Sequence, residues 1–185
     1  MMKNFSIALM HYPVYNKKKE IVASSVTNLD IHDIARCART YGLHKYFIVH
    51  PQKFQRDFVS DMISYWDKGY GKEYNNDRSI AMEIVETVEN LQEIEDKYGE
   101  HKLIITTAQI RSDGIDIKSL ANEALLNPDK NYLILFGTGW GLTEEIFQMA
   151  DYTLKPVFGA DGYNHLSVRS AVAIILDRIK VAIEN

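Results

Sequence analysis

The stretch Leu133-Ile-Leu-Phe-Gly-Thr-Gly-Trp-Gly-Leu-Thr-Glu-Glu-Ile146 decides the fold of this chain. An apolar run typical of a buried strand ends in three glycines at alternate positions, from Gly137 to Gly141. Thr143 then suits the N-cap of a helix whose first turn carries two glutamates. Such a turn is typical of the carboxyl edge of an α/β sheet, where small molecules bind. The alternative is a tight strand-to-helix turn without a ligand, and this stretch alone leaves both open.

The segments around this stretch alternate between predicted strands and predicted helices. Strands are predicted over 6–14, 45–50, 102–108, 132–136 and 152–156. Helices are predicted from Pro51 to about 68 and over 30–41, 79–97, 115–126, 143–150 and 166–183, with an interruption left open within 79–97 and a mobile loop over 69–77. The strands are apolar throughout, which indicates an α/β fold with a parallel sheet and helices on both faces. We therefore predict a single domain over residues 1–185.

Composition limits the class of protein. The chain has 185 residues, of which 46% are hydrophobic and 25% charged, as in an ordinary soluble protein. No apolar run approaches the roughly 20 residues of a membrane span, and no signal-peptide cleavage site is evident. One cysteine, Cys37, excludes an internal disulfide framework, and the six histidines lack metal-ligand spacing. We expect a cytoplasmic protein without a membrane anchor or a metal site.

The charge balance argues against a broad nucleic-acid-binding face. The net charge is −4, whereas such faces are basic. A local patch can still act within an acidic protein, and the densest basic cluster is Lys17-Lys18-Lys19. Three adjacent lysines are more often a solvated loop than a binding site.

The glycine pattern does not match the common nucleotide-binding motifs. A dinucleotide site has Gly-x-Gly-x-x-Gly after its first strand, whereas Gly137 to Gly141 form Gly-x-Gly-x-Gly after the fourth predicted strand. The chain contains no P-loop motif and no Gly-x-Ser-x-Gly elbow.

Two further loops are predicted beside the glycine loop. The segment 150–174 gives a short strand, a loop with Gly159 and Gly162, and a helix that begins around Asn164 and Ser167. The loop Thr106–Gln109 follows the preceding strand. Loops at neighbouring strand ends are expected to form the walls of one pocket.

Three motifs in order along the chain resemble a known family. Phe136-Gly-Thr-Gly-Trp-Gly-Leu142 with Ala150-Asp151 looks like the middle motif of the SPOUT class of S-adenosylmethionine-dependent RNA methyltransferases. Pro156-Val157 and Tyr163-Asn-His-Leu-Ser-Val-Arg-Ser-Ala-Val172 resemble its last motif, and Asp30-Ile-His-Asp-Ile-Ala-Arg-Cys-Ala-Arg-Thr-Tyr-Gly42 its first. The loop over 106–109 is also similar to that of the tRNA guanine-N1 methyltransferase branch.

The resemblance implies a fold, a cofactor and partners. It implies that the C-terminal segment forms a trefoil knot, that the protein is a homodimer, and that S-adenosylmethionine lies in the knotted pocket. It places the cofactor against Thr107, Ala108, Gly137, Thr138, Gly139, Trp140, Gly141, Leu142, Lys155, Pro156, Val157, Asn164, His165 and Leu166. Glycines suit this role because backbone groups can approach the ligand closely.

The resemblance also suggests one catalytic residue. Arg36 matches the first-motif arginine, which ribose methyltransferases place near the target hydroxyl. Because its pKa exceeds about 12, an arginine orients a phosphate or stabilises an oxyanion rather than acting as a base. The alternative is a solvated helix residue. His165 and Asp161 are weaker candidates for the base.

The motifs differ from the family pattern at several positions. Gly139 stands where the family has Glu, His165 where it has Asn, and Asp30 and His32 where it has Asn and Gly. Three functions therefore remain open. The first is an RNA methyltransferase acting on tRNA or rRNA, at a ribose 2′-O or a purine ring nitrogen. The second is an S-adenosylmethionine-binding protein that has no activity without an RNA-binding partner. The third is a generic α/β nucleotide-binding module.

Overall fold

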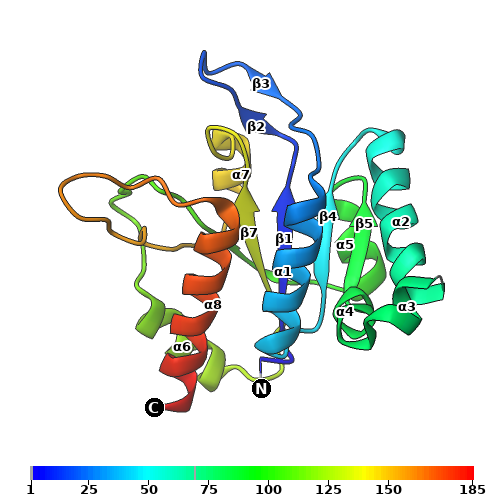
Figure 1. Ribbon diagram of the computed structural model, residues 1–185. Coiled ribbons are helices and arrows are strands. Elements are labelled where there is room, and N and C mark those ends of the chain that lie inside the picture. The colour runs from blue at the N-terminus through cyan, green and yellow to red at the C-terminus, as the bar shows by residue number, and fades with distance from the viewer. Residues whose placement is uncertain (1, 69) are drawn as a thin grey trace.

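Six parallel strands form the central sheet. The structure, a computed structural model, describes residues 2–68 and 70–185. The strand order is β5-β4-β1-β7-β6-β8 (Figure 1). The strands are β1 (Phe5–Met10), β4 (Tyr46–Val49), β5 (Val85–Val88), β6 (Lys102–Ile105), β7 (Tyr132–Gly137) and β8 (Tyr152–Thr153). All neighbouring strands pair in parallel, as predicted.

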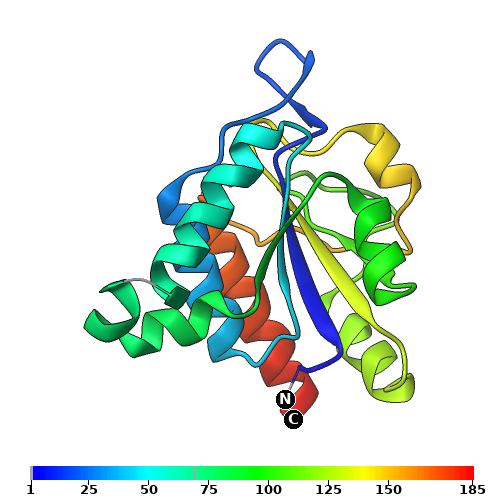
Figure 2. The same ribbon diagram turned by 90° about the vertical axis from the view of Figure 1, so that its right-hand side faces the viewer.

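Alternate residues of the central strands are buried on opposite faces of the sheet. Phe5, Ile7 and Leu9 of β1 belong to one core cluster, and Ala8 and Met10 belong to the other. The first cluster is covered by α1 (Asn28–Thr40), α2 (Lys53–Lys68), α4 (Asn76–Met82), α6 (Ile117–Leu126) and α8 (Val168–Glu184), and the second by α5 (Leu91–Tyr98) and α7 (Glu144–Gln148). Figure 2 shows α1, α2 and α8 on one side of the sheet and α5 and α7 on the other, so the prediction of helices on both faces is confirmed.

A short hairpin follows β1. The predicted strand over 6–14 ends at Met10, and the chain then forms β2 (Val14–Tyr15) and β3 (Ile21–Val22), which pair antiparallel. The hairpin projects beyond the carboxyl edge of the sheet (Figure 1). Lys17, Lys18 and Lys19 lie at its exposed tip.

The predicted helix over 79–97 is wrong, because it contains the strand β5. The run Ile84-Val85-Glu86-Thr87-Val88 is rich in β-branched residues, which favour a strand. Its register places Val85 beside Tyr46 and Val88 beside Val49. Asn90 then caps α5 by accepting a hydrogen bond from the Glu93 backbone N–H at 3.0 Å.

The predicted mobile loop over 69–77 is also wrong, although residue 69 itself lies outside the described residues. Tyr70–Tyr74 form the short helix α3, and α4 begins at Asn76. The side chain of Asn75 accepts from the Arg78 backbone N–H at 3.1 Å, which caps α4. The polar residues in this segment therefore cap and cover helices. Among the described residues, no helix is long and apolar enough to cross a membrane.

Candidate cofactor site

Three loops meet at the carboxyl edge of the sheet. They are residues 106–109 after β6, residues 137–142 at the end of β7, and residues 154–166 after β8. Because β6 lies between β7 and β8, the loops are neighbours. Every predicted cofactor-binding residue lies in one of these loops. The structure thus brings together segments that the sequence separates by up to about 60 residues, as strand order at a shared edge requires.

The first and third loops are joined by hydrogen bonds. The Asn164 side-chain amide donates to the Ala108 carbonyl at 2.8 Å. The backbone N–H of Ile115 donates to Thr153 at 2.8 Å, and that of Lys155 donates to Ile115 at 2.8 Å. The segment from 106 to 115 is therefore held on one side by residues 153–155 and on the other by Asn164. Two of the predicted cofactor-binding residues, Ala108 and Asn164, are in direct contact.

The three glycines of the second loop have different environments. A Cβ at Gly137 would lie 2.9 Å from Leu142 Cγ, and one at Gly139, where φ is +57°, would lie 2.8 Å from the Tyr15 carbonyl. Gly141 has φ +98°, and a Cβ there would meet no atom within 4 Å. Packing explains the first two glycines, whereas Gly141 faces open space. The packing hypothesis is therefore confirmed for Gly137 and Gly139, and the ligand hypothesis stays a prediction for Gly141.

Thr138 anchors the glycine loop from beneath. Its hydroxyl donates to the Met10 carbonyl at 3.0 Å and lies 2.5 Å from Ser24 Oγ. A hydroxyl has one proton, so Thr138 accepts from Ser24, and Ser24 in turn accepts from His11 Nδ1 at 2.9 Å. This chain of hydrogen bonds assigns the proton of His11 to Nδ1. The side chain of Thr138 thus fixes the loop, and its contribution to a cofactor would come from its backbone.

Two buried histidines complete this network. Burial, together with the neighbouring His50, lowers the pKa of His11 from 6.5 to about 4. The two rings lie 5.9 Å apart, and His50 Nε2 lies 3.1 Å from the Ser24 carbonyl. Burial also lowers the pKa of His50. Both histidines are therefore neutral at neutral pH. The sequence did not reveal this pair, because residues 39 positions apart meet only through the pairing of β1 with β4.

The other predicted residues are unevenly exposed. Trp140 is 57% and Leu166 45% exposed, and His165 is exposed with its ring 5.4 Å from that of Tyr163. Leu142 is buried in the core and supports the loop from below. The remaining members divide into exposed Lys155, buried Pro156, and half-buried Thr107 and Val157.

Arg36 and the first motif lie on α1. Arg36 is exposed, and within residues 2–68 and 70–185 no carboxylate lies within 4 Å of its guanidinium. Asp30, the residue in place of the family's Asn, is buried and bound by Arg169, whose Nη1 lies 2.8 Å from Asp30 Oδ1. Arg169 also lies 3.4 Å from Asp33. This arginine, which sequence reasoning missed, links the N-terminal turns of α1 and α8.

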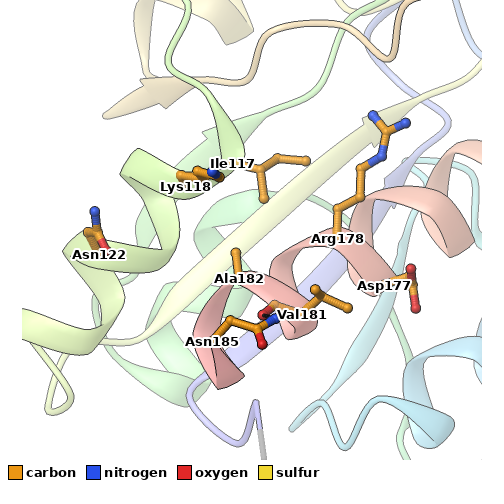
Figure 3. Close-up of a pocket in the computed structure, with 8 residues that line it drawn as sticks. All are labelled: Ile117, Lys118, Asn122, Asp177, Arg178, Val181, Ala182 and Asn185. Atoms are coloured by element: carbon orange, nitrogen blue, oxygen red, sulfur yellow. Dashed lines mark hydrogen bonds between the residues drawn. The ribbon is translucent and has the colours of Figure 1, made fainter.

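One groove lies away from the three loops. A groove of about 640 Å³ runs between α6 and α8, as Figure 3 shows. It is lined by Ile117, Lys118, Asn122, Asp177, Arg178, Val181, Ala182 and Asn185. None of the predicted cofactor-binding residues lines this groove.

Comparisons with known proteins agree with the motifs. A family described as SAM-dependent RNA methyltransferase matches residues 4–181. A tRNA (guanine-N(1)-)-methyltransferase from Oleidesulfovibrio alaskensis is 40% identical over 181 residues, which is 96% of this chain and 42% of that protein. An uncharacterized protein from Aquifex aeolicus is 40% identical over 182 residues, 96% of this chain and 88% of that protein. The chain thus spans less than half the length of the first relative.

Solved structures show the same fold. A probable methyltransferase from Bordetella pertussis Tohama I has a TM-score of 0.70 at 15% identity, over 98% of this chain and 95% of that one. The SpoU methyltransferase AviRb from Streptomyces viridochromogenes, solved with AdoMet, has a TM-score of 0.57 at 14% identity, over 98% of this chain and 58% of that one. Since the family match extends over nearly all the residues that build the sheet and its loops, the chain belongs to the family of S-adenosylmethionine-dependent RNA methyltransferases.

Proposed function

We propose that this protein methylates tRNA, at a ribose 2′-O or a purine ring nitrogen, with the cofactor held by the three loops at the carboxyl edge. The observation that carries the proposal is the convergence of all predicted cofactor-binding residues on that edge. The choice of tRNA is supported by two relatives named tRNA (guanine-N(1)-)-methyltransferase, of which this chain covers 42% each.

The residues at this edge fit S-adenosylmethionine. Gly141 faces open space, so a ligand can reach the backbone of the glycine loop. The hydrogen bond from Asn164 to Ala108 holds the other two loops together. The cofactor would be held by backbone groups of residues 137–142, 155–157 and 164–166. When bound, S-adenosylmethionine supplies a methyl group on a sulfonium.

The protein then has to position the RNA and remove one proton. Methyl transfer is an in-line displacement, for which alignment provides much of the rate. Arg36 would bind an RNA phosphate or stabilise the developing oxyanion, because its guanidinium is exposed and without a carboxylate partner among the described residues. His165 and Asp161 lie in the third loop and are the nearest candidates in sequence to accept the proton.

Further features belong to this proposal. The C-terminal segment forms a trefoil knot, which the contacts of residues 106–115 with 153–155 on one side and Asn164 on the other support. The protein acts as a homodimer in the cytoplasm. An accessory RNA-binding partner would compensate for the acidic net charge of −4.

Calorimetric titration with S-adenosylmethionine, S-adenosylhomocysteine and NAD tests the cofactor assignment. We expect the first two to bind at micromolar concentrations or below and NAD not to bind. Absence of binding by both adenosyl compounds would overturn the assignment of the three loops.

Methyl transfer to RNA separates the enzyme from the alternative. Purified protein is incubated with methyl-labelled S-adenosylmethionine and either bulk tRNA or total RNA. We expect label in tRNA. Cofactor binding without transfer to any RNA would favour the alternative, a cofactor-binding protein that is inactive without a partner.

A further inference from the structure

We propose that the β2–β3 hairpin binds the phosphates of the substrate RNA and holds the target nucleotide over the glycine loop. Its three lysines, Lys17, Lys18 and Lys19, are the binding groups. The inference rests on the proposed function, since it assigns RNA to the side of the molecule that holds the cofactor loops. It adds a substrate-binding element that the family motifs do not contain.

The hairpin is fixed directly to the glycine loop. The backbone N–H of Trp140 donates to Tyr15 at 2.8 Å, and the N–H of Tyr15 donates to Gly141 at 2.9 Å. Val14 also forms an antiparallel bridge with Leu142. Close contact requires glycine at Gly139, where a Cβ would lie 2.8 Å from the Tyr15 carbonyl. A ligand bound to the hairpin is therefore held in register with the loop.

The tip of the hairpin is ordered by its own hydrogen bonds. Asn16 Oδ1 accepts from the backbone N–H groups of Lys18 at 2.8 Å and Glu20 at 3.0 Å. Lys19 has φ +65°, the left-handed conformation that a three-residue hairpin loop requires at its last position and that normally favours glycine. A lysine there costs about 1 kcal/mol of backbone strain. A lysine at this strained position is explained if its charge contributes to binding.

The charge at the tip is not neutralised. Among the described residues, no carboxylate lies within 4 Å of the three ammonium groups. Two acidic side chains close to the tip, Glu20 and Glu144, are already engaged. Glu20 accepts from Asn16 at 2.7 Å, and Glu144 is paired with Arg111 at 3.0 Å. A positive cluster on a protein of net charge −4 attracts a polyanion locally.

Exposed aromatic side chains accompany the lysines. Tyr12, just before the hairpin, is 43% exposed. Trp140, whose backbone N–H donates to Tyr15 of the hairpin, is 57% exposed. Lysines that track a backbone and aromatic rings on which bases stack are the combination that single-stranded nucleic acid recognises. The geometry favours RNA over a protein partner for this reason.

A charge-matched pair of variants tests the proposal. In the first, Lys17, Lys18 and Lys19 are each replaced by Gln. In the control, Lys3, Lys68 and Lys130, which are exposed near the amino edge of the sheet, are each replaced by Gln. Binding of fluorescently labelled bulk tRNA is measured between about 50 and 200 mM salt, the range over which phosphate contacts weaken strongly.

We expect the hairpin variant to bind tRNA at least about tenfold more weakly. The slope of log affinity against log salt concentration should become less steep by about 2, because each lost phosphate contact removes about 0.7 to 0.9 from that slope. The control variant should bind like the original protein, and both should keep their affinity for S-adenosylmethionine. Equal tRNA binding by the two variants would overturn the proposal, as would absence of tRNA binding by the original protein.

The two proposals fail in different ways. If the original protein binds S-adenosylmethionine but the hairpin variant keeps its tRNA affinity, the hairpin assignment is wrong and the proposed function stands. If tRNA binding depends on the hairpin but no adenosyl compound binds, the cofactor assignment is wrong and the hairpin assignment stands. Replacing Lys19 by Gly alone adds a second measure. It should raise stability while weakening tRNA binding, since glycine relieves the strain and removes one charge.

Discussion

The two edges of the sheet differ in their buried polar side chains and in their surface grooves. At the carboxyl edge, buried His11 and His50 and the hydroxyl of Thr138 form a polar network beneath the loops. Two grooves, of about 640 and 310 Å³, lie away from these loops, the first between α6 and α8 and the second beside the start of β1. The polar network, rather than the volume, marks the edge where the predicted cofactor residues converge.

The first prediction concerns the stability of the carboxyl edge in acid. The pKa of His11 is about 4 in the folded protein and 6.5 in an exposed histidine. Between these values the unfolded chain binds more protons, so stability falls as the pH falls from about 6.5 toward 4. The full effect is about 3 kcal/mol, at about 1.4 kcal/mol for each pKa unit.

Urea unfolding at several pH values checks this prediction. The original protein should lose stability steeply over this window, and a His11→Gln variant should lose less. Identical pH dependence in the original protein and the His11 variant would show that the buried network does not control acid stability.

The second prediction concerns Arg36. Arg36→Ala should lower methyl transfer to tRNA about 100-fold, the usual loss when a group that stabilises developing charge is removed. Cofactor affinity should not change. Arg39→Ala is the control, because Arg39 is an exposed arginine on the same helix. Equal activity of the two variants would make Arg36 a solvated helix residue, which is the alternative stated above.

The third prediction compares the edges directly through two glycines. Gly141 at the carboxyl edge and Gly99 at the end of α5 both have positive φ, +98° and +79°, and both face open space. Valine at either position should destabilise the protein by about 1–2 kcal/mol through backbone strain. Only Gly141→Val should weaken binding of S-adenosylmethionine, by at least about tenfold, because its side chain would occupy the ligand's space. Calorimetry that finds both variants equal in affinity would contradict the role of Gly141.

The fourth prediction is the smallest. Lys118 and Asn122 line the groove between α6 and α8 (Figure 3), and each is replaced by Ala. Each should leave cofactor affinity unchanged and shift stability by no more than about 0.5 kcal/mol, as is usual for surface substitutions. A loss of cofactor binding in either variant would indicate that the cofactor binds in this groove instead of at the three loops.

Local patterns were enough to predict most of the sheet. The apolar runs at β1, β4, β6 and β7 and the helix signals at Thr143 and Ser167 lie where the structure has them. Even so, Thr143 occupies the N-cap without a side-chain hydrogen bond. The errors occurred where the residue composition and the spacing of hydrophobic residues favour different structures. β5 has four residues between two helices, and the polar segment around Asn75 caps a helix rather than forming a loop.

The site was predictable only in part. The glycines and the third loop were evident, because their motifs lie within short stretches of sequence. The hairpin contact with Gly139, the Arg169–Asp30 pair and the His11–Ser24–Thr138 network join residues far apart in sequence. Such contacts follow from strand order and register, which single-sequence patterns do not determine.

The bond between Ser24 and Thr138 has a consequence for evolution. The two hydroxyls are 114 positions apart in sequence, and each is the partner of the other in a partly buried site. Loss of Thr138 leaves the Ser24 hydroxyl without its acceptor, and loss of Ser24 leaves His11 Nδ1 without its acceptor, each at a cost of about 1–3 kcal/mol. Among homologues, positions 24 and 138 should therefore change together, and the statistical coupling between them should be stronger than between either position and the neighbouring exposed residues.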